Sequence, residues 1–277
     1  MINKSMVITD LDGTLLNNNQ SVSRIDYQTF CNLGEQNILR VIATGRSLYS
    51  LHKVLRDDFP IDYVIFSCGS GIMEWSSKKI IRSHQIKTKN VIHISDFLVE
   101  NGFDFSIQKT IPQNHHFVFH STGNHNPDFV RRCELYREYC SPICFNPKNF
   151  QEASQIIVIA PDNLSLYHNL RHEFYQYKII RTTSPLDGKS LWIEFLPKNV
   201  SKGHAVEWLC EILGIRQEKT IGIGNDYNDL DFLNWTERSF MVENAPQELK
   251  KLFSFTASNQ NNGFSEALRD LGMVGLD

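Results

Sequence analysis

The sequence predicts an α/β protein whose main domain is a doubly wound parallel sheet that carries an inserted α+β domain. Three observations support this fold class. Strand-like apolar runs alternate with helical segments at both ends of the chain, the alternation breaks down in the middle, and a length of 277 residues suits two domains. The chain is therefore expected to form one discontinuous domain with a second domain inserted into it.

The N-terminal part shows the β-α-β-α-β order of a parallel sheet. Its apolar runs are bounded by turn residues, and the first helical segment begins at Ser23 and ends at Gly34, a helix-terminating residue. The expected elements are a strand at 7–10, a helix at 23–34, a strand at 38–43, a helix at 47–57, a strand at 63–67 and a hairpin at 72–82.

The middle block, residues 84–188, has paired strands without strict alternation with helices, which predicts an α+β domain. Its expected elements are a helix at 90–101, strands at 103–108 and 116–121, a helix at 128–139, a strand at 155–160, a helix at 164–175 and a strand at 177–183. The α/β alternation resumes with a strand at 191–196, a helix at 202–213, a strand at 219–223, a helix at 229–234 and a short helix opened by Pro246. The main domain is thus predicted to contain residues 1–83 and 189–277.

Composition argues against several classes of function. A net charge of -3 offers no general attraction to nucleic acid or to an anionic membrane surface. No apolar stretch approaches the roughly 20 residues that span a bilayer, and the first strand begins too close to Met1 to leave room for a signal peptide. The six cysteines lack C-x-x-C spacing and are expected to be reduced. The predicted protein is cytoplasmic, monomeric or homodimeric, and binds neither nucleic acid nor membrane.

The segment 10–15 is the most informative part of the chain. Asp10 and Asp12 follow an apolar strand and lie two residues apart, so on an extended chain their side chains point the same way. Two carboxylates at about 4 Å repel each other by roughly 4 kcal/mol at an effective dielectric constant near 20, which favours a cation between them. The turn at Gly13 and Thr14 offers N–H groups and a hydroxyl to a phosphate oxygen. An ordinary strand end with an acidic turn gives the same local pattern.

Three further fragments fall at strand ends or helix starts, where open α/β sheets bind ligands. Thr44-Gly45-Arg46 follows a strand and offers a hydroxyl and a backbone N–H, although such turns are common. Lys202 lies in the first turn of a helix, where the helix dipole disfavours a cation, so either a nearby anion or simple exposure to solvent explains it.

The third fragment, residues 222–229, places hard oxygen side chains at a strand end. Asn225, Asp226, Asn228 and Asp229 lie within five residues, a donor set that suits Mg²⁺. An Asx-rich turn that caps the next helix is the alternative explanation.

Together these fragments resemble the motifs of the haloacid dehalogenase superfamily of phosphotransferases, and specifically its Cof-like branch with a type IIB cap. The resemblance covers nearly the whole chain and rests on four motifs in the expected order: residues 10–15, 44–46, 202–203 and 224–229. It implies a Rossmann-like core at 1–83 and 189–277, a cap at 84–188, Mg²⁺ as cofactor, and hydrolysis of small phosphate monoesters, frequently sugar phosphates or nucleotides.

The resemblance also implies a role for each motif residue. Asp10 would attack phosphorus and form an aspartyl phosphate, and Asp12 would act as general acid and base. The remaining roles are electrostatic: Lys202 as the catalytic cation, Thr14, Thr44 and Gly45 as phosphate-binding residues, Arg46 as a substrate-binding residue, and Asp10, Asp12, Asn225, Asp226 and Asp229 around Mg²⁺.

Two positions depart from the family pattern. Asn225 stands where the family commonly has Asp, and an amide ligand brings no charge. The hypothesis is that Asp226 or Asp229 supplies the missing charge while Asn225 stays near the metal. Cys68-Gly69 replaces the usual Asn-Gly after the third strand, and Cys68 is expected to be a buried packing residue.

The predicted function is a Mg²⁺-dependent phosphatase of a small phosphorylated metabolite, most simply a sugar phosphate. A sugar phosphomutase and a catalytically weak phosphometabolite-binding protein are the alternatives. The cap is expected to select the substrate, and its histidines at 115, 116, 120 and 125 are interpreted as strand and loop residues, with sugar contacts or a transition-metal site as further hypotheses. His168 and His172 are one helical turn apart, a spacing that is usually a solvated face.

Overall fold

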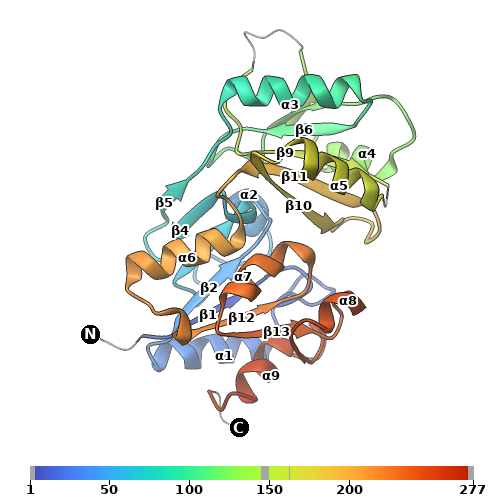
Figure 1. The fold of residues 1–277 in the computed structure, drawn as a ribbon. Coiled ribbons are helices and arrows are strands. Elements are labelled where there is room, and N and C mark those ends of the chain that lie inside the picture. Colours follow the sequence, from blue (N-terminus) through green and yellow to red (C-terminus); the bar gives the residue numbers. More distant parts are fainter. Residues whose placement is uncertain (1–3, 145–149, 162, 274–277) are drawn as a thin grey trace. The chain divides into compact units, whose positions relative to one another are not determined.

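The computed structural model describes residues 4–144, 150–161 and 163–273. The chain divides into two compact units, of which the first contains residues 1–82 and 201–277 and the second contains residues 83–200. Each unit is built around its own β-sheet (Figure 1).

The first unit has an eight-stranded sheet in the order β14-β13-β12-β1-β2-β3-β4-β5. The strands from β14 to β3 run parallel, and β4 turns back antiparallel to β3. The strands are β1 (Met6–Thr9), β2 (Leu39–Ala43), β3 (Tyr63–Phe66), β4 (Gly71–Glu74), β5 (Lys79–Ser83), β12 (Thr220–Gly224), β13 (Arg238–Val242) and β14 (Ser254–Thr256). This order brings the carboxyl ends of β12, β1, β2 and β3 to one edge of the sheet.

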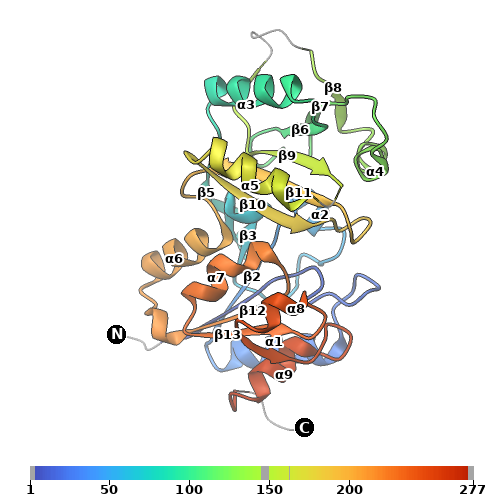
Figure 2. The same cartoon turned by 45° about the vertical axis from the view of Figure 1, so that its right-hand side comes forward.

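Helices cover both faces of this sheet, so the predicted doubly wound core is confirmed (Figures 1 and 2). The helices are α1 (Arg24–Glu35), α2 (Leu48–Leu51), α6 (Lys202–Leu213), α7 (Leu230–Trp235), α8 (Gln247–Lys250) and α9 (Gly263–Arg269). On one face α6 packs against α7, and on the other Phe30 of α1 stacks on Phe264 of α9 with ring centroids 4.5 Å apart. Across the described residues, no helix is long and apolar enough to cross a membrane.

The second unit has a six-stranded sheet in the order β10-β11-β9-β6-β7-β8. Its strands are β6 (Phe105–Gln108), β7 (Phe117–His120), β8 (Cys140–Pro142), β9 (Gln155–Ala160), β10 (Tyr177–Thr183) and β11 (Leu191–Pro197). Its helices are α3 (Thr88–Glu100), α4 (Pro127–Leu135) and α5 (Leu164–Glu173). Pairing is antiparallel except between β7 and β8, as an α+β unit requires.

One predicted strand belongs to the other sheet. The run at 191–196 was assigned to the main domain, but β11 pairs antiparallel with both β9 and β10 of the second unit. A short turn after Thr183 returns the chain directly into a hairpin, with Thr183 opposite Leu191. Apart from Glu194, β11 is apolar, a character that buried strands of either sheet share, so its pattern did not distinguish them. The chain re-enters the first unit at Ser201 instead of at residue 189.

Two helix predictions also differ from the structure. The helix expected at 47–57 is regular only over Leu48–Leu51, because after His52 the chain continues in turns. Pro246 is the N-cap of α8 and not its first helical residue.

Candidate active site

The four sequence motifs of the first unit are built on adjacent parallel strands. Asp10 directly follows β1, and its backbone N–H donates to the carbonyl of Ile223 in β12 at 2.8 Å. The segment that begins at Gly224 is therefore the immediate neighbour of Asp10. Thr44 directly follows β2, on the other side of β1. The topology thus places the motifs at one edge of the sheet, the position where α/β proteins bind ligands.

Lys202 lies between two carboxylates. Its ammonium Nζ donates to Asp10 Oδ1 and to Asp229 Oδ1, each at 2.6 Å. The three side chains are buried, with exposed fractions of 1% for Lys202, 6% for Asp10 and 0% for Asp229. Ser201 caps α6 by accepting from the N–H of His204, so the first turn of the helix is fixed and aims Lys202 at the strand end. Of the two explanations that the sequence offered for Lys202, a nearby anion and exposure to solvent, the structure therefore supports the nearby anion.

The charges of this cluster do not balance. Burial raises the pKa of the Asp10 carboxyl to about 8, assisted by the negative charge of Asp229 and opposed by Lys202. Burial acts to lower the pKa of Lys202, but the two carboxylates outweigh it and raise that pKa. Burial and the second carboxylate thus disfavour the charged form of Asp10, and a further positive charge beside Asp10 would offset both effects.

Asp229 organises the loop after β12. Its Oδ2 accepts the backbone N–H groups of Asn225 at 2.8 Å and Asp226 at 3.0 Å, while its Oδ1 binds Lys202. Asp226 in turn caps the short 3₁₀ helix Tyr227–Asp229 by accepting the N–H of Tyr227. The Asx-rich turn expected from the sequence is thus present, and it is tied to the buried lysine.

Asn225 lies against the turn that follows Asp10. Thr14 Oγ1 donates to Asn225 Oδ1 at 3.1 Å, and a Cβ at Gly13 would lie 2.6 Å from Asn225 Nδ2. Gly13 also has a φ of 76°, in the left-handed region that favours glycine. Asn225, within the 225–229 segment, therefore directly contacts the turn that follows Asp10.

Asp12 and Arg46 form a two-point ion pair. Arg46 Nε donates to Asp12 Oδ2 at 2.8 Å, and Arg46 Nη2 donates to Asp12 Oδ1 at 2.6 Å. Arg46 Nη1 also donates to the carbonyl of Ser50, and Nη2 donates to the side-chain oxygen of Gln20. The sequence assigned Arg46 to the substrate, whereas its observed partners are protein groups.

Thr44 and Cys68 lie at the ends of β2 and β3. Thr44 is buried, and its hydroxyl accepts the N–H of Arg46 at 3.1 Å. The N–H of Cys68 donates to the Thr44 carbonyl at 3.1 Å, which joins the two strand ends. Cys68 is fully buried, as expected, and Gly45 is exposed.

Two asparagines that the sequence analysis did not select support the turn after Asp10. Asn244 Nδ2 donates to the Gly13 carbonyl at 2.8 Å, and Asn259 Nδ2 donates to the Leu16 carbonyl at 2.9 Å. Asn259 is linked to Asn244 through its backbone N–H. Their distance along the chain from the turn left no local pattern to find.

The donors at the strand end fit a hard cation that keeps several waters. Among the described residues, no group of three or more His, Cys, Asp or Glu side chains is arranged to hold a metal ion. The site instead offers the carboxylate of Asp10 and the amide oxygen of Asn225. Both are oxygen donors, the type that Mg²⁺ prefers, and a cation would offset the burial and the nearby carboxylate that raise the pKa of Asp10.

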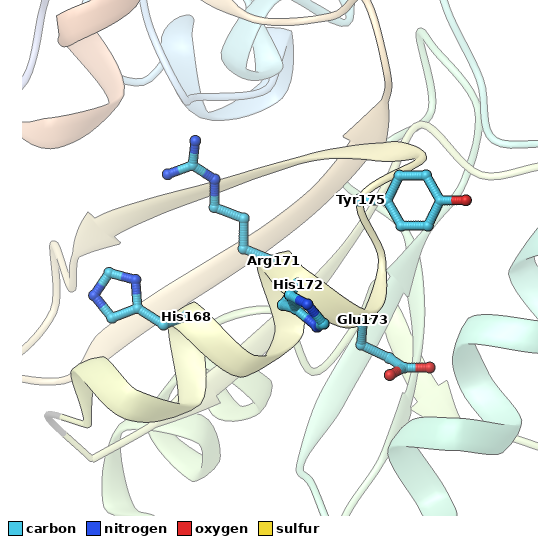
Figure 3. Close-up of a pocket in the computed structure, with 5 residues that line it drawn as sticks. All are labelled: His168, Arg171, His172, Glu173 and Tyr175. Atoms are coloured by element: carbon cyan, nitrogen blue, oxygen red, sulfur yellow. The ribbon is translucent and has the colours of Figure 1, made fainter.

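A separate surface hollow lies in the second unit. It has a volume of about 680 Å³ and is lined by His168, Arg171, His172, Glu173 and Tyr175 (Figure 3). Figure 3 shows the rings of His168 and His172 set apart, without convergence on a common point. All five residues are exposed, so His168 and His172 lie on a solvated helix face, as the sequence predicted. The residues that line this hollow include none of the predicted site residues.

Comparison with known proteins agrees with this geometry. The family model of the haloacid dehalogenase-like hydrolases matches residues 7–268, which is nearly the whole chain. The chain therefore belongs to this family, and the resemblance to its Cof-like branch is confirmed.

Relatives match over their full length. A protein of Streptococcus pyogenes serotype M6 is 26% identical over 278 residues, covering 95% of this chain and 97% of that protein. The 5-amino-6-(5-phospho-D-ribitylamino)uracil phosphatase of Bacillus subtilis is 24% identical, covering 93% of this chain and 94% of that enzyme.

Solved structures share the fold. A phosphatase of the haloalkanoate enzyme superfamily from Bacteroides thetaiotaomicron has a TM-score of 0.80 at 17% identity, covering 98% of this chain and 96% of that chain. A sugar phosphatase of subclass IIB has a TM-score of 0.78 at 17% identity, covering 98% of this chain and 100% of that chain.

Proposed function

We propose that this protein is a Mg²⁺-dependent phosphatase that hydrolyses small phosphate monoesters, most simply sugar phosphates, through an aspartyl-phosphate intermediate. The observation that carries this proposal is the buried cluster of Asp10, Lys202 and Asp229 at the end of β1. A carboxylate in that position, paired with a cation and backed by a second carboxylate, has the elements of a nucleophile for phosphoryl transfer.

The protein groups divide the reaction between them. A carboxylate oxygen of Asp10 attacks phosphorus, and the bond from phosphorus to the leaving oxygen breaks as Asp12 donates a proton to that oxygen. Asp12 then takes a proton from the water that attacks phosphorus, the bond between phosphorus and Asp10 breaks, and free phosphate leaves with the Asp10 carboxylate and the protonated Asp12 restored. Lys202 neutralises charge beside Asp10 throughout, and the Thr14 and Thr44 hydroxyls with the Gly45 backbone N–H are proposed to hold phosphate oxygens.

The metal would be held by Asp10, the backbone carbonyl of Asp12 and Asn225. When bound, Mg²⁺ supplies positive charge that lets a carboxylate approach an anionic phosphoryl group. Asn225 is preferred to Asp226 and Asp229 because it contacts the turn after Asp10, whereas Asp226 caps a 3₁₀ helix and both oxygens of Asp229 bind protein donors. This revises the sequence hypothesis, in which Asp226 or Asp229 supplied the charge.

The substrate class follows from the family and from two related proteins. One is named a phosphatase of a ribitylamino-uracil phosphate and the other a sugar phosphatase, and both names specify phosphate monoesters of polyhydroxylated compounds. We assign substrate selection to the second unit as a type IIB cap, because the first unit carries all the residues proposed for the chemistry.

The proposal is tested by phosphate release from a panel of pentose and hexose phosphates, nucleoside monophosphates and 4-nitrophenyl phosphate. Turnover should require Mg²⁺ and should be abolished in Asp10→Asn, which keeps the size of the side chain. Asp58→Asn is the matched control, because Asp58 is paired only at the surface with Arg56, and it should keep the wild-type rate.

Three results would contradict the proposal. Free phosphate that is released equally by wild type and Asp10→Asn would exclude Asp10 as nucleophile. An isomerised sugar phosphate in place of free phosphate would identify a mutase, and tight binding without turnover at millimolar Mg²⁺ would identify a binding protein.

A further inference from the structure

The ion pair of Arg46 and Asp12 has a geometry that ordinary surface pairs lack. Both carboxylate oxygens of Asp12 are bound, by Nε at 2.8 Å and by Nη2 at 2.6 Å. A two-point contact between planar groups fixes the plane of the carboxylate as well as its position. The Asp12 side chain retains 31% exposure, so a ligand can still reach it.

Arg46 is itself held in place by the protein. Its Nη1 donates to the carbonyl of Ser50 at 3.1 Å, and its Nη2 also donates to the side chain of Gln20. Four of the five N–H groups of the guanidinium are thus directed at protein acceptors. A guanidinium engaged in this way is arranged to orient its partner and not to clamp a substrate.

We propose that Arg46 is a positioning residue that orients the Asp12 carboxylate for proton transfer to the leaving group. This inference rests on the proposed phosphatase function, in which Asp12 is the general acid. It replaces the direct substrate contact that the sequence assigned to Arg46. The role depends on the forked shape of the guanidinium, so positive charge alone does not supply it.

The dependence of the rate on the leaving group distinguishes a positioning role of Arg46 from a purely structural one. An alkoxide is a poor leaving group and needs a proton from the general acid, whereas 4-nitrophenolate leaves readily without one. Loss of orientation at Asp12 should therefore slow alkyl phosphates far more than 4-nitrophenyl phosphate. A general loss of folded enzyme would slow both substrates by the same factor.

The experiment compares kcat/KM for an alkyl phosphate and for 4-nitrophenyl phosphate in wild type, Arg46→Ala and Arg46→Lys. With the alkyl substrate we expect a fall of about 100-fold in both variants, the lower range for a general acid, and a much smaller fall with the aryl substrate. Arg46→Lys keeps the positive charge, so the two kcat/KM values can still be compared if Arg46→Ala fails to fold. Added ethylguanidinium should restore part of the alkyl phosphatase activity of Arg46→Ala.

The chain offers two matched controls with the same forked geometry. Arg40 binds Asp62 through two points inside the first unit, with side-chain exposures of 16% and 27% that resemble those of Arg46 and Asp12. Arg56 binds Asp58 through two points at the surface. Arg40→Ala should lower the melting temperature and leave the ratio of the two kcat/KM values unchanged, and Arg56→Ala should change neither.

Each contrary outcome is distinguishable. Equal losses on both substrates, full activity in Arg46→Lys, or a faster enzyme after Arg46→Ala would overturn the positioning role while leaving the phosphatase proposal standing. Absence of Asp10-dependent turnover in the wild type would overturn both.

Discussion

Two buried carboxylates of the first unit, Asp10 and Asp26, differ in the groups that surround them. Burial raises the pKa of both. Asp26 lies in the first turn of α1 and accepts hydrogen bonds from the hydroxyl of Ser23 and from the N–H and hydroxyl of Ser265. Asp10 has an ammonium group at 2.6 Å and a second carboxylate next to that group.

The difference shows how a structural carboxylate is told from a reactive one. The hydrogen-bond donors to Asp26 are neutral, and because Ser265 belongs to α9 they join two helices. The Asp10 cluster instead places two carboxyl groups around one ammonium group at a strand end, the position where α/β proteins bind ligands. Burial and a raised pKa are common to both and therefore do not identify a site.

The largest effect is expected from Lys202→Met, which removes the one ammonium group shared by Asp10 and Asp229. Breaking a buried ion pair leaves uncompensated charge and costs about 3–5 kcal/mol. We therefore expect loss of turnover together with a large fall in the free energy of unfolding, measured by urea titration.

The double variant Lys202→Met/Asp229→Asn separates the two effects. Removal of one carboxylate should recover part of the stability because fewer charges are left unpaired, but turnover should stay lost. If the single variant proved as stable as wild type, the charge imbalance inferred for this cluster would be wrong.

A smaller effect is expected at the loop after β12. Asn225→Asp adds a charged ligand beside Asp10 and should lower the Mg²⁺ concentration needed for half-maximal activity, by about tenfold, since ligand charge tunes the affinity of oxygen sites. Asp226→Ala should leave that concentration nearly unchanged, because Asp226 serves as a helix cap. A Mg²⁺ titration of activity in both variants checks the assignment, and a raised requirement only in Asp226→Ala would restore the original sequence hypothesis.

Local pattern was sufficient for much of the fold and for bringing the candidate site residues to one edge of the sheet. The strands at 155–160 and 177–183 and the helix at 202–213 have the predicted bounds, because their periodicity and caps are local. The grouping of Asp10, Thr44, Lys202 and the 224–229 segment followed from strand order.

Side-chain partners could not be predicted in the same way. The sequence offered no means of choosing Asp12 over a substrate as the partner of Arg46, since the two residues are 34 positions apart and meet only through the sheet. The sheet to which β11 belongs was equally hidden, because an apolar strand suits either core. Asn244 and Asn259 act through contacts with carbonyls, which any donor at the right place would make.

The smallest effect is expected at Asp26. Because its pKa is raised in the folded protein above the ordinary 3.8, folding favours its protonated form. The stability that Asp26 contributes is therefore fully present below pH 3.8 and is lost as the pH rises toward the folded pKa. As the pH rises over that range, the unfolding free energy of the wild type should fall relative to that of Asp26→Asn. Urea titrations at several pH values measure this difference. Ser265→Ala removes a donor that lowers the pKa of Asp26, so this pKa should rise further. The unfolding free energy of Ser265→Ala should therefore fall more steeply with rising pH than that of the wild type. A wild type and an Asp26→Asn variant that respond identically to pH would mean that folding leaves the pKa of Asp26 unchanged, and a raised pKa would then distinguish Asp10 from Asp26.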